Sequence, residues 1–207
     1  MTRRKPSTLT DLALVAVFAG LIAAFSLAPA IPVGALMVPI TLQTLAVALT
    51  AMILGPWRGF AATCLYLLLG FVGLPVFAGG AAGIGVLVRP SAGYLLAFPI
   101  AALVIGFLAR RFVLRFGTAG RRWGLFVVAG LAGSILVIHP LGIVGMSING
   151  AMPLQAAAVL DLAYWPGDVI KTVIAALVAV AVHRAFPDLF APVAPVVDSE
   201  RTSAHIG

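Results

Sequence analysis

Six apolar runs of membrane-spanning length dominate this sequence and limit the folds that it can adopt. A helix that crosses a bilayer needs roughly 17–25 predominantly apolar residues. Runs of about that length are Leu12–Ala30, Leu36–Leu54, Phe60–Val76, Tyr94–Phe112, Trp123–Met146 and Pro166–Phe186. They lack the alternating pattern of a membrane β-barrel, so helices are the expected spanning structure. We therefore predict an all-α membrane protein with a bundle of six transmembrane helices.

The composition also favours a membrane protein over a soluble domain. Hydrophobic residues make up 62% and charged residues 9% of the 207 residues, whereas a soluble domain is about 45–50% apolar. Such an excess cannot be hidden in one small core, so lipid must contact most of the surface. The first run also resembles a signal peptide, with a small-residue site at Ala28-Pro29-Ala30. It is longer than a usual signal sequence, so we expect a first span.

The net charge of +7 is explained by membrane topology rather than by nucleic acid. With the N-terminus inside, eleven of the 13 Lys and Arg residues fall on one side, as the positive-inside rule expects. They are Arg3, Arg4, Lys5, Arg58, Arg110, Arg111, Arg115, Arg121, Arg122, Arg184 and Arg201. We predict that both termini are cytoplasmic and that any attraction of the basic side to anionic membrane lipid is a side effect of this topology. The expected parts are a cytoplasmic N-terminus (1–11), a six-helix transmembrane domain (12–186) and a flexible cytoplasmic tail (187–207).

Two cations break this pattern and point to a site. Arg89 falls in the outer loop between the third and fourth runs, and Lys171 falls inside the outer end of the sixth. Pro166 suits the first position of a helix, which places Asp168 in the first turn and Lys171 on the same face. Charges inside a membrane are costly and usually face a cavity as a pair. The pair is either a structural cap or one wall of a polar pocket that opens outward.

Other polar and aromatic residues are expected at the same outer end. A glycine-rich loop, Leu74–Gly85, has a backbone that can approach a ligand closely. Threonine at a helix start is also a common cap, so Thr41 alone is weak evidence. The candidate substrate-binding residues are Asp168, Lys171, Tyr94, Thr41, Gln43, Arg89, Phe77 and Gly80. Together they suit a small amphipathic acid, with its carboxylate on Lys171 or Arg89 and its N–H groups on Asp168.

Several stretches occur in the same order as in the BioY family. They are Val38–Thr44, Leu54–Gly59, Tyr66–Phe77, Gly93–Leu95 and Pro166-Gly167-Asp168 with Lys171. The chain resembles this family from about Leu12 to Val182. BioY proteins are the biotin-specific substrate-binding (S) components of energy-coupling-factor (ECF) transporters. The resemblance implies a six-helix subunit of the bacterial cytoplasmic (inner) membrane that captures biotin from outside with high affinity.

The same resemblance implies partners. They are a transmembrane T component and two cytoplasmic ABC-type ATPases. No Walker A lysine is present in the sequence, so ATP hydrolysis is expected from the partners. No cofactor is expected.

The resemblance implies that ligand contacts come from the outer loops and the start of the sixth run, and we add a hypothesis for the role of each residue. Lys171 is expected to meet the carboxylate of biotin, while Asp168 accepts an N–H or holds the lysine. Arg89 is a departure, because the family commonly has glycine before this proline, and we interpret it as a local addition at the pocket rim. Small residues on the first run resemble the face of S components that docks the T component, although packing within the subunit explains them equally well. They are Ala16, Ala19, Gly20, Ala23 and Ala24.

An enzyme is the least favoured alternative. An intramembrane aspartyl protease needs two carboxylates that face each other near the midplane, whereas Asp161 and Asp168 both lie at the outer end. His139, His183 and His205 lack the spacing of metal ligands, and we interpret His139 as a helix-kink or packing residue. We therefore predict that the protein is not an enzyme. An S component for another small vitamin and a stand-alone biotin carrier are the closer alternatives.

Overall fold

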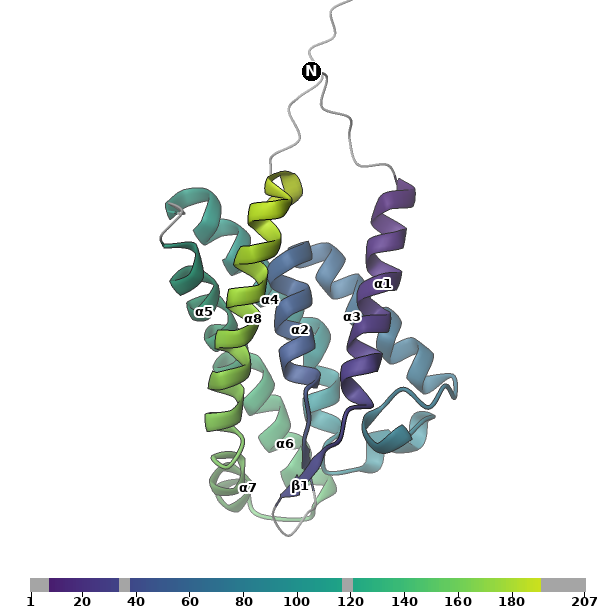
Figure 1. Cartoon of the computed structure of the whole chain (residues 1–207). Helices are drawn as coiled ribbons and strands as arrows, with labels where there is room; N and C mark the ends of the chain where they lie inside the picture. Colours follow the sequence, from purple (N-terminus) through teal and green to yellow (C-terminus); the bar gives the residue numbers. More distant parts are fainter. Residues whose placement is uncertain (1–7, 34–37, 117–120, 191–207) are drawn as a thin grey trace, which may run out of the picture.

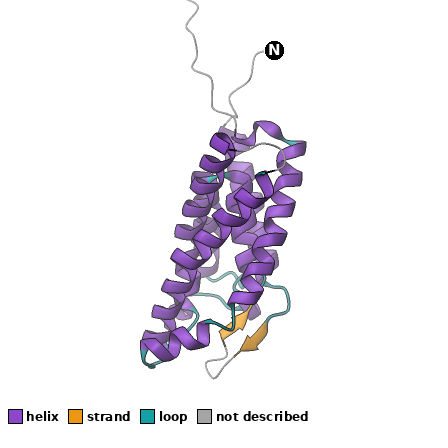
Figure 2. Ribbon diagram, turned by 90° about the vertical axis from the view of Figure 1, so that its left-hand side faces the viewer, coloured by secondary structure: helices purple, strands orange, loops and turns teal. Residues whose placement is uncertain are grey.

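The computed structural model describes residues 8–33, 38–116 and 121–190, and most of these lie in helices, the longest of which run along one long axis (Figures 1 and 2). The principal helices are α1 (Thr8–Ser26), α2 (Gln43–Leu54), α3 (Pro56–Phe71), α4 (Ala92–Phe116), α5 (Arg122–Gly133), α6 (His139–Asn149), α7 (Leu154–Asp161) and α8 (Trp165–Ala185). Four short helices complete the order: η1 (Ala78–Gly80), η2 (Ile84–Val88), η3 (Ser134–Ile138) and η4 (Pro187–Phe190). Arg3, Arg4, Lys5 and Arg201 lie outside the described residues. The helix η4 extends regular structure into the first residues of the predicted tail.

Four stretches of the described chain are long and apolar enough to cross a membrane. They are Thr8–Ser26, Ala92–Arg115, Arg122–Asn149 and Trp165–Ala185. The two remaining predicted spans are shorter than expected, because α2 has 12 residues and α3 has 16. A 12-residue helix is only about 18 Å long, against a hydrocarbon core of about 30 Å.

A two-stranded hairpin explains why the second predicted span begins late. The strands β1 (Ile31–Val33) and β2 (Val38–Ile40) pair antiparallel, with Ile31 opposite Ile40, and they join α1 to α2. The expectation of a continuous helix over Leu36–Leu54 was therefore wrong at its start. Proline at position 39 cannot donate the backbone hydrogen bond that a helix interior needs, which favours an extended segment there.

The helix α2 occupies the centre of the bundle. Every residue of α2 except Thr44 is buried, and α1, α3, α4 and α8 pack around it. A helix that is apolar all round is expected to be enclosed by other helices. The start of α2 is therefore held firmly where the hairpin ends.

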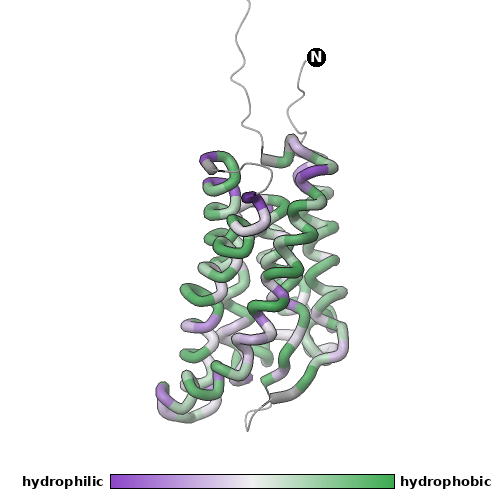
Figure 3. The backbone as a smooth tube through the Cα atoms, turned by 60° about the vertical axis from the view of Figure 1, so that its left-hand side comes forward, coloured by the Kyte–Doolittle hydropathy of each residue, from purple (hydrophilic) through white to green (hydrophobic). Residues whose placement is uncertain are grey.

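Apolar residues predominate along the helices of the bundle, as the hydropathy colouring of Figure 3 shows. Large side chains point outward with high exposure, including Val17 at 67%, Leu136 at 69% and Ile148 at 71%. Exposed apolar surface on this scale fits contact with lipid rather than water.

The described cations separate between the two ends of the bundle, as predicted. Basic residues gather where α4 ends, α5 begins and α8 ends, at the end of the bundle where α1 begins (Figure 1). Arg89, which follows η2, and Lys171, near the start of α8, lie toward the opposite end together with β2.

A π-helical segment lies within the fifth predicted span. The five residues of η3 connect α5 to α6 with helical backbone angles on both sides, so that Arg122–Asn149 forms one apolar stretch. The predicted span Trp123–Met146 falls within it. His139 and Pro140 open α6 directly after the π-helical turn.

Candidate functional site

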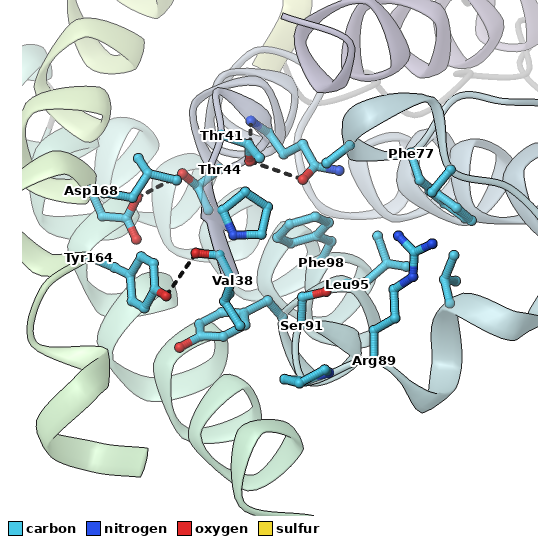
Figure 4. A pocket seen from close by; sticks show the side chains of 18 of the residues that line it. Val38, Thr41, Thr44, Phe77, Arg89, Ser91, Leu95, Phe98, Tyr164 and Asp168 are labelled. Carbon is cyan, nitrogen blue, oxygen red and sulfur yellow. Dashed lines mark hydrogen bonds between the residues drawn. The ribbon is translucent and has the colours of Figure 1, made fainter. Parts of the chain in front are cut away.

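A cavity of about 370 Å³ opens at the hairpin end of the bundle, within the range of about 300–1,000 Å³ typical of small-ligand sites. Side chains from β2, the start of α2, the η1–η2 loop, α4 and α8 converge on it (Figure 4). Its lining residues are Val38, Pro39, Ile40, Thr41, Gln43, Thr44, Phe77, Ala78, Ala81, Val86, Arg89, Pro90, Ser91, Tyr94, Leu95, Phe98, Tyr164, Asp168 and Lys171. Seven of the eight predicted binding residues are therefore brought together.

Asp168 and Lys171 form an ion pair in the wall of this cavity. The Lys171 Nζ donates to Asp168 Oδ1 at 2.8 Å and to Thr44 Oγ1 at 3.2 Å, while Thr44 Oγ1 donates to the same Asp168 oxygen at 2.8 Å. Their side chains are only 9% and 11% exposed. The two charges lie on one face of the first turns of α8, as the spacing predicted, and they face the cavity rather than lipid.

A second buried carboxylate, Asp161, lies behind the cavity wall. It accepts hydrogen bonds from the Tyr94 hydroxyl at 2.6 Å and the Trp165 indole at 2.8 Å, and His139 Nδ1 lies 2.9 Å from it. The indole of Trp165 stacks on the His139 ring. Burial raises the pKa of Asp161, but these hydrogen bonds outweigh it and leave the pKa below its usual value, so the group is a carboxylate at neutral pH.

The geometry argues against a protease dyad of Asp161 and Asp168. The imidazole of His139 lies between the two carboxylates, with Nε2 3.7 Å from Asp168 Oδ2. An aspartic dyad shares one proton between facing carboxyl groups, which an interposed ring prevents. The interpretation of His139 as a packing residue was incomplete, because its ring connects the two acids.

Thr41 and Gln43 present oriented polar groups to the cavity. Thr41 Oγ1 donates to Gln43 Oε1 at 3.0 Å, and Gln43 Nε2 donates to the Tyr66 hydroxyl at 2.7 Å. The Tyr66 hydroxyl in turn donates to Ser26 at the end of α1. This chain of bonds fixes the amide orientation and links three helices at the cavity edge.

The glycine-rich loop contributes one aromatic wall. Phe77 is 3% exposed and packs its ring edge-on against Tyr66, with Gly70 leaving space for it. Gly80 does not line the cavity, although its neighbours Ala78 and Ala81 do. Its φ of +72° lies in the left-handed region that favours glycine, so Gly80 is explained by the turn of the loop. Arg89 stands at the rim and is exposed.

Sequence reasoning missed several lining residues. Thr44 lies three residues after Thr41, and Leu95 and Phe98 follow Tyr94 on one face of α4, so helical spacing was the available signal. Tyr164 also lines the cavity, and its hydroxyl donates to the Val38 carbonyl at 3.0 Å (Figure 4).

The small residues of α1 divide into two groups. Ala16, Gly20 and Ala24 are exposed, and a Cβ added at Gly20 would meet nothing within 4 Å. Ala19 is 1% exposed and Ala23 is half-buried, so both pack inside the subunit. Only the first group forms an open face in this structure.

Comparison with known proteins identifies the family. The BioY family model matches residues 1–188. The chain belongs to the BioY family. Its relatives include the biotin transporter BioY of Rhizobium etli, which is 39% identical over 86% of this chain and 95% of the relative. The biotin transporter BioY of Rhodobacter capsulatus is 38% identical over 82% and 90%, and the probable biotin transporter BioY of Bacillus subtilis is 38% identical over 86% and 92%.

A solved structure shows that the fold is that of an S component. The crystal structure of the S-component for biotin from an ECF-type ABC transporter superposes with a TM-score of 0.80. The alignment covers 88% of this chain and 95% of that one, at 24% identity. All of these relatives are named as transporters rather than enzymes, in agreement with the sequence prediction.

Proposed function

We propose that this protein captures biotin from outside the cell and takes it up as the S component of an ECF-type transporter. The observation that carries this proposal is the cavity with the Asp168–Lys171 pair in its wall, in a chain of the BioY family. Biotin has a cyclic urea, a thiophane ring and an aliphatic carboxylic acid arm. The cavity offers hydrogen-bond donors and acceptors for the urea and the carboxylate, and apolar side chains for the ring and the aliphatic arm.

The proposal is tested by isothermal titration of biotin into purified protein. Tight binding by the wild type and a loss of at least tenfold with Lys171→Met are expected, because the variant leaves Asp168 without its cation. The fold of the variant is checked by circular dichroism. An absence of biotin binding by the wild type would overturn the proposal, and mass spectrometry of a co-purified small molecule would then identify another vitamin.

We place the chain in the bacterial cytoplasmic membrane with six crossings and both termini inside. The four long apolar stretches supply four crossings. The remaining two are α2, continued by the hairpin strand β2, and α3, which are short but packed within the bundle. Cysteines introduced singly at positions 2 and 203 should react with a membrane-impermeant thiol reagent only after the cells are opened.

Partners of the ECF type are proposed to dock on the Ala16–Gly20–Ala24 face of α1. The face is exposed, and small residues let another helix approach closely. Gly20→Leu should leave biotin binding unchanged but prevent co-purification of a T component and two ATPases. Gly124→Leu is the matched control, since a side chain there also enters open space. Biotin uptake without any ATPase would favour a stand-alone carrier.

A further inference from the structure

Arg89 is held over the cavity by its backbone rather than by its side chain. It follows η2, and its carbonyl accepts a hydrogen bond from Asn149 Nδ2 at 2.9 Å. The same amide nitrogen donates to the Leu87 carbonyl at 2.8 Å. Asn149 is the last residue of α6, so the end of that helix fixes the position of the Arg89 backbone.

The guanidinium of Arg89 has no protein partner in the described part of the chain. It makes no hydrogen bond or ion pair with residues 8–33, 38–116 or 121–190. Figure 4 shows its side chain across the cavity from Asp168 and Tyr164, with the guanidinium directed toward Phe77. A cation without a protein partner among the described residues therefore lies at one side of the cavity.

The charges of the lining residues do not cancel. Three charged residues line the cavity among the described residues, namely Asp168, Lys171 and Arg89. Asp168 and Lys171 neutralise each other at 2.8 Å, which leaves the single positive charge of Arg89. The cavity as a whole is suited to a ligand with one negative charge.

The paired charges disfavour an anionic group beside them. A carboxylate placed on Lys171 would also lie near the carboxylate of Asp168, and like charges at such short range repel. A neutral cyclic urea, with two N–H donors and one carbonyl acceptor, matches the acceptor of Asp168 and the donor of Lys171. The negative end of the ligand then belongs on the other side, where Arg89 stands.

We propose that Arg89 binds the free carboxylate of biotin and makes this protein selective for the free acid over its amides. The inference rests on the proposed function, since it concerns the same cavity. The cyclic urea lies at Asp168 and Lys171, and the aliphatic arm crosses the apolar wall of Leu95 and Phe98. This orientation replaces the sequence-based expectation that Lys171 meets the carboxylate.

The test compares biotin with biotinamide, which replaces the carboxylate by a neutral group of similar shape. Titration calorimetry measures both ligands on the wild type, Arg89→Gln and Lys171→Met. Arg89→Gln should weaken biotin binding by about tenfold, the factor expected for one charge-assisted contact. Biotinamide binding should change less than twofold. Lys171→Met should weaken the binding of both ligands by the same factor.

Two further variants sharpen the comparison. Arg89→Lys should retain most of the preference for biotin, because the positive charge is kept. Arg111→Gln removes an exposed cation at the opposite end of the bundle and should change the affinity for neither ligand. The preference of the wild type for biotin should also fall as salt concentration rises, since Arg89 is exposed and its field is screened.

The outcomes separate the two proposals. If the wild type binds neither ligand, the proposed function fails and the inference fails with it. If the wild type binds biotin and Arg89→Gln weakens both ligands equally, or neither, the inference alone is wrong. Selective loss of biotin affinity supports it.

Discussion

The ion pair of Asp168 and Lys171 should stabilise the protein even without ligand. Removing one partner of a buried pair costs about 3–5 kcal/mol. In Lys171→Met, the Asp168 carboxylate keeps its bond from Thr44 and the nearby His139 ring, so we expect the lower end, about 3 kcal/mol. For a chain of this size that corresponds to a fall in unfolding temperature of roughly 6–12 °C.

The double variant Asp168→Asn/Lys171→Met gives the decisive comparison. It contains neither charge, and an asparagine amide still accepts the Thr44 hydroxyl proton, so most of the loss should be recovered. We expect its free energy of unfolding to lie within about 1 kcal/mol of the wild type. Strong non-additivity is the signature of two residues in direct contact.

Cys64 supplies the assay, because it is the single cysteine of the chain and lies within α3. A thiol-reactive fluorescent dye reports its exposure as detergent-solubilised protein is heated without biotin. Arg111→Met serves as the control for loss of an exposed cation, and it should change stability by less than about 0.5 kcal/mol. A double variant as unstable as the sum of the single variants would refute the reasoning.

Three other substitutions test the contacts of Tyr94 and Asp161. Tyr94→Phe removes a hydrogen bond to the Asp161 carboxylate, and the same dye assay should show a loss of roughly 1.5–3 kcal/mol; an unchanged unfolding temperature would contradict the bond. Asp161→Asn turns an amide NH₂ toward groups that donate to a carboxylate, so it should destabilise more than Tyr94→Phe, and a smaller loss would argue against the network. Gly142→Ala would place a methyl group in the volume of the Tyr94 ring, which should destabilise by roughly 1–3 kcal/mol and lower biotin affinity, whereas Gly124→Ala should change neither.

The sequence predicted the parts of the site that are local in the chain. Pro166, Asp168 and Lys171 lie within six residues, so helical spacing was enough to place both charges on one face. The separation of the cations between the two ends was also predictable, because it follows from membrane topology.

Contacts between distant segments could not be predicted in this way. Thr44 joins Asp168 across 124 residues, and Tyr94 joins Asp161 across 67. Periodicity carries no information on which helices become neighbours. The hairpin was missed because hydropathy treats Leu36–Leu54 as uniform, although Pro39 already disfavours a helix there.

The π-helical turn of η3 determines the direction in which each side chain of α6 points around the helix axis. Each residue added to an α-helix rotates the next side chain by about 100°, and a π-turn accommodates an additional residue without breaking the helix. Shortening Ser134–Ile138 by one residue would therefore swing His139 away from Asp161 and bring a different residue than Gly142 against Tyr94. The phase of one helical turn thus aligns the residues that form the rear wall of the cavity.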